Sequence, residues 1–248
     1  MFLNEVRQPN NSVIIKDIIK KEIKTAHVFE KYGIDFCCGG NRLLEEVCAE
    51  KNLVVENILS ELDKVLQAPT EKKQRFDSWE LPFLMEYIIN NHHAYVKEAI
   101  PLIQEHSTKV ANKHGKNYPF MIEVKSLFDR VAKEMHEHME KEEKIVFHII
   151  KYLDDCRKFN ETPKTGGFKT VKSPIQKMEN EHSSAGNAME QIKKLTNNFL
   201  PPEGACNTFR LTYSELEEFE KDLHIHVHLE NNILFPKAIK LEEDLLRN

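Results

Sequence analysis

Histidine and glutamate recur at one spacing in two distant segments of the chain. Residues 138–147 (HMEKEEKIVF) and 226–235 (HVHLENNILF) both read His-x3-Glu-x4-Phe. A separation of four residues brings a histidine and a glutamate to the same face of a helix. Each segment also has a histidine upstream, with His93 45 residues before the first pair and His182 44 residues before the second. The repeat indicates two related helix pairs, with one ligand set from each half of a bundle.

These residues fill gaps in apolar helical stripes. A helix that faces a core places apolar side chains at steps of three and four residues. Around the first pair, that stripe consists of Val131, Met135, Ile145 and Ile149. Glutamate is almost never buried unless it is paired or coordinates a metal. The positions that break the four stripes predict a metal site with seven candidate ligands: His93, His114, His138, Glu142, His182, His226 and Glu230.

Two simpler interpretations compete with a metal site. A single inward histidine is usually an ordinary core residue, and a His-x3-Glu pair also suits an exposed helix face. The coincidence of seven such residues with a repeat favours the metal site. His92 is an alternative to its neighbour, but His93 is in phase with His114, three heptads further on. We expect solvated faces for the remaining histidines that lie among charged residues, namely His136, His224 and His228.

The donor set points to two metal ions. Five imidazoles and two carboxylates exceed what one tetrahedral zinc requires. Nitrogen and oxygen donors in a bundle core suit two irons, or less favourably two manganese ions, with Glu142 and Glu230 as bridges and the histidines as terminal ligands. Because no cysteine lies on the stripes, an iron–sulfur cluster is not expected there. Seven ligands cannot fill two octahedra, so positions remain for water, an oxo group, O₂ or NO.

The elements that position these residues are helices. Four long helices are predicted at about 80–114, 121–154, 172–199 and 208–245. Short connections favour an antiparallel four-helix bundle over residues 80–248. Residues 1–70 are expected to form a small helical domain, and residues 71–79 a linker. Only 8 of 248 residues are glycine, which supports an all-α protein and leaves no glycine-rich phosphate loop.

Two adjacent cysteines mark the small domain. Cys37 and Cys38 are followed by two glycines and by a helix expected to begin near Arg42. A thiolate just before a helix N-terminus is favoured by the helix dipole, so the pair is a candidate for redox chemistry or iron transfer. The alternative is that two small residues simply pack this turn.

Charge, cysteine count and hydropathy exclude several classes of protein. The net charge is −5 and no basic stripe dominates, so nucleic acid is not an expected partner. We find no signal peptide and no apolar run of the ~18 residues that a membrane span needs. Five cysteines without a zinc-binding pattern are typical of a reducing compartment, so a cytoplasmic location is expected.

The motifs together resemble a known family. The small domain carries YGIDFCCGG at residues 32–40, and the bundle carries HMEKEEKIVF, MENEHSSAG and HLENNILFP. On these motifs the chain resembles, over nearly its full length, the iron–sulfur cluster repair di-iron proteins, known as the repair-of-iron-centres or ScdA-type family. Their bundle is hemerythrin-like. One departure is His148, at a position where the family often has a proline, as at Pro236.

The resemblance implies a function and the same seven iron ligands. It implies a homodimer that repairs iron–sulfur clusters damaged by nitrosative or oxidative stress, with damaged iron–sulfur proteins as clients. Iron would come from a labile di-iron centre with oxo and carboxylate bridges. Two rival hypotheses remain open. One is an enzyme that reduces NO to N₂O at the di-iron site, and the other is a reversible sensor of O₂ or NO.

Overall fold

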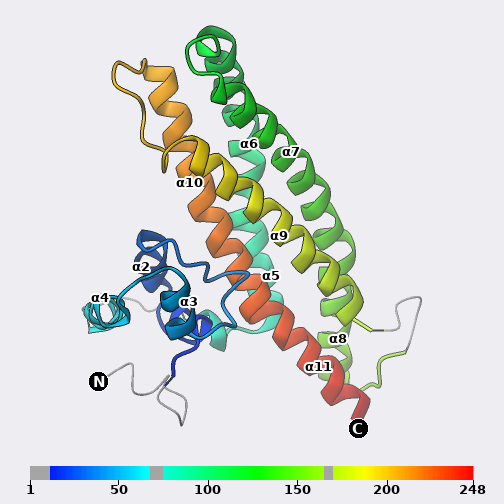
Figure 1. Ribbon diagram of the computed structural model, residues 1–248. Coiled ribbons are helices and arrows are strands. Elements are labelled where there is room, and N and C mark those ends of the chain that lie inside the picture. Colours follow the sequence, from blue (N-terminus) through cyan, green and yellow to red (C-terminus); the bar gives the residue numbers. More distant parts are fainter. Residues whose placement is uncertain (1–11, 68–74, 165–169, 248) are drawn as a thin grey trace.

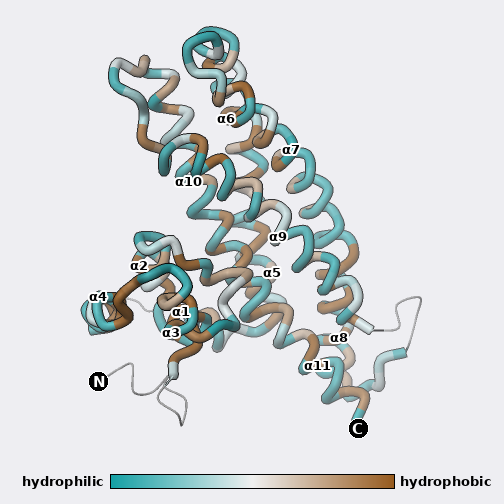
Figure 2. Tube along the Cα trace, viewed as in Figure 1, coloured by the Kyte–Doolittle hydropathy of each residue, from teal (hydrophilic) through white to brown (hydrophobic). Residues whose placement is uncertain are grey.

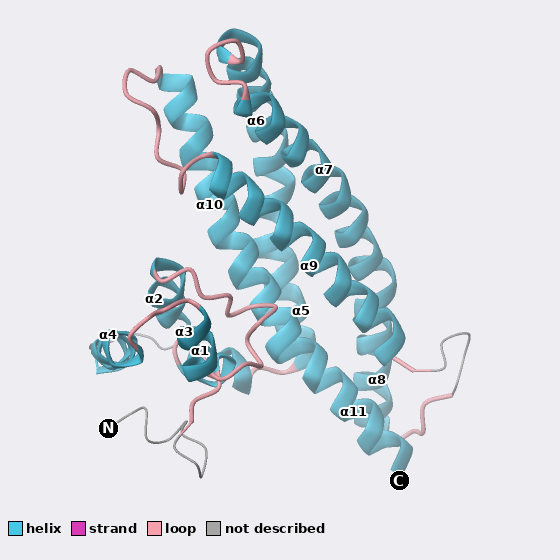
Figure 3. Ribbon diagram, in the orientation of Figure 1, coloured by secondary structure: helices cyan, strands magenta, loops and turns pink. Residues whose placement is uncertain are grey.

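The computed structural model describes residues 12–67, 75–164 and 170–247. It consists of an elongated bundle of four antiparallel helices, with a small helical domain packed against one side (Figure 1). In the described ranges the regular secondary structure is helical, and no strand is present (Figure 3). One isolated antiparallel bridge joins Ile14 to Leu43. The all-α fold predicted from the sequence is therefore confirmed.

The small domain contains four short α-helices around an aliphatic core. Its buried side chains include Ile15, Ile18, Phe29 and Leu62, from three different helices. Gly33 ends the second helix with φ +60°, a backbone conformation that glycine adopts without steric cost. The helices are α1 (Ile15–Lys21), α2 (Ala26–Lys31), α3 (Leu44–Glu50) and α4 (Val55–Gln67), with a 3₁₀ turn at Ile23–Thr25.

Three of the four bundle helices are interrupted by a π-helical turn. The first consists of α5 (Leu81–Tyr87), a π turn (Ile88–His93) and α6 (Ala94–His114). The second consists of α7 (Phe120–Lys141), a π turn (Glu142–Val146) and α8 (Phe147–Phe159). The third is α9 (Lys172–Leu195). The fourth consists of α10 (Asn207–Leu229), a π turn (Glu230–Leu234) and α11 (Phe235–Arg247).

The four predicted helices agree with these segments to within a few residues at most ends. Residues 71–74 of the predicted linker lie outside the described residues, and Phe76–Ser78 forms a 3₁₀ turn. Part of the connection between the second and third helices (residues 165–169) is also outside them.

The π turn in the second helix corrects the predicted apolar stripe. Ile145 was expected to face the core, yet it is 39% exposed, whereas its neighbour Val146 is 1% exposed. The shift persists further on, because Ile150 is buried and Ile149 only half-buried. A π turn accommodates one residue more than an α turn, so it advances every later side chain by one position around the helix.

Two apolar cores meet where the candidate ligands lie. One core contains Val96, Met139 and Ala185, together with buried residues of the small domain. The other contains Ile88, Val146 and further residues from α8, α9 and α11. Each bundle helix passes from one core to the other. Figure 2 shows hydrophobic residues alternating with hydrophilic ones along these helices. The ligands are therefore a polar layer between two hydrophobic ones.

The small domain covers a helix face that was expected to be solvated. His228 is fully buried and His224 half-buried, because the ring of Phe36 packs edge-on against both imidazoles. Charged neighbours along the sequence indicated a solvated face, but another domain occupies it. His136 is exposed, as predicted.

Candidate metal centre

Six of the seven predicted ligands meet in the middle of the bundle. They form two overlapping groups, one of His93, His226 and the two glutamates, and one of His138, His182 and the same glutamates. Within each group, the potential ligand atoms all lie within 4.8 Å of one another, and every member is buried. We call these six residues the six-ligand cluster: His93, His138, Glu142, His182, His226 and Glu230.

The two glutamates are shared between the groups. Oε2 of Glu142 lies 3.4 Å from Nε2 of His93 and 3.3 Å from Nε2 of His138. Glu230 places Oε1 3.2 Å from Nε2 of His226 and Oε2 3.1 Å from Nε2 of His182. Each group therefore takes one histidine from each half of the internal repeat. The sequence predicted one ligand set from each half, and the structure interleaves them.

The cluster has the unpaired buried atoms that a cation would satisfy. Both carboxylate oxygens of Glu142 and Oε2 of Glu230 are buried without a hydrogen-bond partner, as is Nε2 of His93. An unpaired buried polar atom costs about 1–3 kcal/mol, and a charged one costs more. Carboxylate oxygens and imidazole nitrogens are the donors that divalent transition metals take. The residues present therefore fit a pair of cations with shared carboxylate ligands.

The titration behaviour of these groups reflects their mutual charge. Burial disfavours the charged form of His138, but Glu142 and Glu230 outweigh it and raise the pKa of His138 to about 9. Burial and the neighbouring Glu230 oppose ionisation of Glu142, yet His138 and His93 hold its pKa below the ordinary value. Against the effect of burial, His226 and His182 hold the pKa of Glu230 well below its usual range. Both carboxylates are thus kept in the ionised form that metal binding needs.

The outer nitrogen of three cluster histidines is held by a hydrogen bond. His93 donates from Nδ1 to Glu143 (2.9 Å), and His138 donates from Nδ1 to Glu181 (3.0 Å). His182 donates from Nδ1 to Oδ1 of Asn231 (2.8 Å). A partner at Nδ1 fixes the tautomer whose free Nε2 points inward, the usual arrangement around a ligating imidazole.

Sequence reasoning missed these three partners. Each is adjacent to a predicted ligand, since Glu143 and Asn231 follow the two glutamates and Glu181 precedes His182. The signal was a polar residue beside each ligand, but polar residues are equally common on an exposed helix face, and for the two glutamates a lysine is also within reach. Lys97 and Lys141 do reach Glu143 and Glu181, at 2.8 Å each.

Two phenylalanines of the repeat close the cluster on one side. The Phe147 ring stacks on His93 with centroids 5.9 Å apart, and the Phe235 ring stacks on His182 at 6.1 Å. Both begin the helix that follows a π turn. The His-x3-Glu-x4-Phe spacing thus places two ligands and one apolar cover on the same side of each helix.

His114 is not part of the six-ligand cluster. It lies on the same bundle helix as His93 but 21 residues further on, about 30 Å along the axis. There its Nε2 contacts Sγ of Cys206 at 3.3 Å, and its ring packs edge-on against Phe209. Helical phase had grouped His114 with the ligands, but phase fixes only the direction of a side chain and not its distance along the axis. We therefore leave His114 out of the proposed ligand set.

The structure favours His93 over His92 as the inward ligand. His92 belongs to neither group of potential ligands and donates from Nδ1 to Asp222 at 2.8 Å. Its ring stacks on His226 with centroids 5.5 Å apart, so it packs beside the cluster.

The adjacent cysteines lie in a capped loop that contacts the bundle. Asp35 organises this loop, because its Oδ1 accepts the backbone N–H groups of Cys37 (2.9 Å) and Cys38 (3.0 Å), and its Oδ2 accepts that of Gly39 (2.9 Å). The next helix begins at Leu44, later than expected, so the thiols are not at its N-terminus. Asp35, Cys37 and Cys38 form a third group of potential metal ligands.

The two thiols differ in their tendency to ionise. A hydrogen bond with Cys38, burial and the charge of Asp35 together raise the pKa of Cys37 well above its ordinary value. The same hydrogen bond lowers the pKa of Cys38, with smaller help from His182. Cys38 is therefore the more nucleophilic sulfur, and it is also the less buried of the two.

The fold and the site together define a class of protein. A bundle whose buried core carries interleaved histidines and shared glutamates is a cation-binding bundle of the hemerythrin kind. Residues 84–238 match the family model described as the hemerythrin HHE cation binding domain. Residues 12–66 match a second model, ScdA_N, described as a domain of unknown function (DUF542).

Comparison with named proteins identifies the family. The chain is 32% identical to the iron-sulfur cluster repair protein ScdA of Staphylococcus haemolyticus over 92% of this chain and 98% of that protein. It is 36% identical to the iron-sulfur cluster repair protein YtfE of Escherichia coli O157:H7, over 87% of this chain and 91% of the relative. It is also 36% identical to a probable iron-sulfur cluster repair protein of Haemophilus influenzae, over 86% and 90%. The chain belongs to this ScdA/YtfE family of iron–sulfur cluster repair proteins, with a hemerythrin HHE domain.

The described helices do not have the character of membrane spans. Within the described ranges, none combines enough length with enough hydropathy to cross a bilayer.

Proposed function

We propose that this protein binds two iron ions in the six-ligand cluster and supplies iron to damaged iron–sulfur clusters in client proteins. The observation that supports it most is the sharing of Glu142 and Glu230 between two buried ligand groups. The relatives are named for iron–sulfur cluster repair, which gives the function its direction.

The donor set favours iron over the commoner structural zinc. Each position offers two imidazole nitrogens and two shared carboxylates, without a thiolate. Structural zinc is usually held by four ligands of its own that include cysteine, whereas shared carboxylates in a helical bundle suit paired iron. A bound pair of irons would supply ligand-accepting positions and one-electron redox chemistry.

Release of iron would depend on the two glutamates that belong to both ligand groups. Glu142 and Glu230 each serve both positions, so a shift or protonation of one carboxylate weakens both. Three of the four histidines stay in place, because hydrogen bonds hold the outer nitrogens of His93, His138 and His182. The chain thus combines fixed nitrogen donors with a shared pair of oxygen donors, which favours a centre that can be emptied without unfolding.

Cys37 and Cys38 are the proposed groups for handing iron on, or for redox chemistry during its transfer. They lie in a loop that contacts the cluster helix through Asn231 and Asn232. Their thiols and the Asp35 carboxylate would give a departing iron soft and hard donors outside the core. Binding of NO or O₂, a homodimer and a cytoplasmic location stay predictions.

Metal analysis and a repair assay test this function. Protein purified anaerobically without chelators should contain about two irons per chain and restore activity to an enzyme whose [4Fe–4S] cluster has been damaged by NO. Glu230→Ala should lose both properties. His136→Ala changes an exposed histidine and serves as the matched control. Zinc, or no metal, in freshly prepared wild-type protein would refute the proposal.

A further inference from the structure

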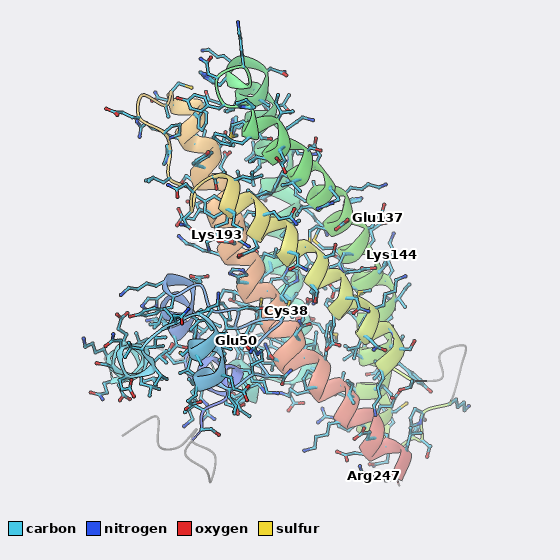
Figure 4. All side chains as sticks on the ribbon, viewed as in Figure 1. Cys38, Glu50, Glu137, Lys144, Lys193 and Arg247 are labelled. Carbon is cyan, nitrogen blue, oxygen red and sulfur yellow. The ribbon has the colours of Figure 1, made fainter. Side chains whose placement is uncertain are left out.

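One side chain contacts both the six-ligand cluster and the cysteine loop. Oδ1 of Asn231 accepts the Nδ1–H of His182 at 2.8 Å, while its Nδ2 donates to Sγ of Cys38 at 3.9 Å. Figure 4, which labels Cys38, shows this residue on the side of the small domain that faces the bundle. The sulfur and the imidazole are therefore two contacts of one amide group.

The type of side chain matters at this position. The corresponding partners of His93 and His138 are carboxylates, Glu143 and Glu181, which only accept hydrogen bonds when ionised. An amide both accepts and donates, so asparagine can hold an imidazole N–H and a sulfur at once. Of the three histidines in the six-ligand cluster that have a hydrogen bond at Nδ1, His182 is the one whose partner is neutral.

The next residue fixes the cysteine loop in position. Nδ2 of Asn232 donates to the backbone oxygen of Cys37 at 3.1 Å and lies 3.1 Å from Nδ1 of the buried His228. Gly40 allows this approach, since a Cβ there would lie 3.3 Å from the same Nδ2 and 2.4 Å from the Phe36 oxygen. Because Asn232 holds the backbone of the cysteine loop, the Cys38 sulfur stays within reach of Asn231.

We propose that Asn231 is a positioning residue that couples Cys38 to the His182 side of the metal centre. When the Cys38 sulfur no longer accepts from the amide, as when it binds an ion, Asn231 loses one of its two anchors. His182 then loses part of its support, and the position it shares with His138 holds its metal less firmly. This inference rests on the proposed function, because it concerns the iron bound there.

Iron release measures the coupling directly. Anaerobic protein loaded with two ferrous ions is mixed with excess chromogenic ferrous chelator, and the two release phases are timed. Loss of a hydrogen-bond partner of a metal ligand typically changes affinity 10–100-fold. We therefore expect Cys38→Ala and Asn231→Ala each to accelerate one phase about tenfold or more. The double variant should be no faster than Asn231→Ala, because both changes break the same connection.

A matched variant separates coupling from general loosening. Glu143→Gln weakens the hydrogen bond that Glu143 accepts from His93. Asn231 binds His182 and not His93, so this change leaves the connection to the cysteine loop intact. Its effect should multiply with that of Cys38→Ala. Multiplicative effects for Cys38→Ala and Asn231→Ala, or no effect of Cys38→Ala alone, would overturn the coupling.

A second measurement needs no metal. In metal-free wild-type protein, ¹⁵N NMR of His182 should show the Nδ1–H tautomer and a shift that changes in Cys38→Ala. In Asn231→Asp the acceptor remains but the donor is lost, so the tautomer should persist and become insensitive to Cys38→Ala. Continued sensitivity in Asn231→Asp would overturn the proposal. Failure of the wild type to bind two irons would refute the proposed function. The NMR result would still test whether Asn231 couples Cys38 to His182.

Discussion

Glu142 and Glu230 approach each other at the centre of the bundle, with a carboxylate oxygen of each within 4.8 Å of the other. Both are fully buried, and each belongs to both groups of potential ligands. Two like charges this close in a low-dielectric core repel each other strongly unless cations lie between them. The shared pair would therefore make the two proposed metal positions interdependent.

This interdependence predicts different stoichiometries for glutamate and histidine variants. Glu142→Ala removes a ligand from both positions, so we expect the iron content to fall from about two per chain towards zero. His93→Ala removes a ligand from one group only, so about one iron should remain. Iron and protein are quantified together after gel filtration in chelator-free buffer. Equal iron losses in the two variants would show that the carboxylates are not shared.

His114 supplies a second test of the ligand set. It lies at the far end of α6, beside Cys206, and belongs to neither ligand group. His114→Ala should therefore leave the iron content and the optical spectrum unchanged, and the free energy of unfolding within about 1 kcal/mol. His93→Ala, on the same helix, is the comparison. Loss of iron in His114→Ala would restore this residue to the candidate ligands.

Much of the site could be predicted because burial and helical spacing are local properties. The repeat of His138 and Glu142 at four residues, seen again at His226 and Glu230, identified two helix faces without any knowledge of the fold. Helical phase alone does not give the distance along the axis, and at a rise of about 1.5 Å per residue two positions that share a face can lie at opposite ends of a helix. His114 was assigned to the cluster for that reason.

Other errors arose from features that the sequence does not encode locally. A π turn depends on tertiary strain more than on residue preference, so the change of phase after Glu142 left no mark in the apolar pattern. The burial of His228 depends on Phe36, a residue of another domain about 190 positions earlier. The contact between the cysteine loop and the bundle has the same long-range origin.

The change of phase is testable by a pair of neighbouring substitutions. Val146 is 1% exposed and Ile145 is 39% exposed. Val146→Ala removes two buried methyl groups and should lower the free energy of unfolding by about 2 kcal/mol. Ile145→Ala should change it by no more than about 0.5 kcal/mol. Urea unfolding of the metal-free proteins gives both values, and the reverse order would mean that the α-helical phase continues through residues 142–146.

The protonation of His138 predicts how the stability of the metal-free protein depends on pH. The pKa of His138 is about 9 in the folded protein, against an ordinary value of 6.5, because Glu142 and Glu230 favour the charged imidazole despite burial. A pKa raised by folding means that the folded state binds the proton more tightly than the unfolded state. The stabilisation is complete below pH 6.5 and is lost as the pH rises through 9. Its upper limit is about 3 kcal/mol, because each tenfold change in proton affinity corresponds to about 1.4 kcal/mol.

Bound metal should reverse this dependence, which makes the comparison decisive. Ligation requires the neutral imidazole, so protons compete with the cation and iron is held more firmly as the pH rises. We expect the unfolding temperature of the metal-free protein to fall between pH 6.5 and 9. The unfolding temperature of the iron-loaded protein should stay constant or rise over the same range. In His138→Gln the decline of the metal-free protein should be smaller, whereas His136→Ala, at an exposed site, should behave like the wild type. A metal-free protein whose unfolding temperature is flat across this range would mean that the two glutamates do not hold a proton on His138. The charge balance inferred for the empty cluster would then be incorrect, even if iron binds there.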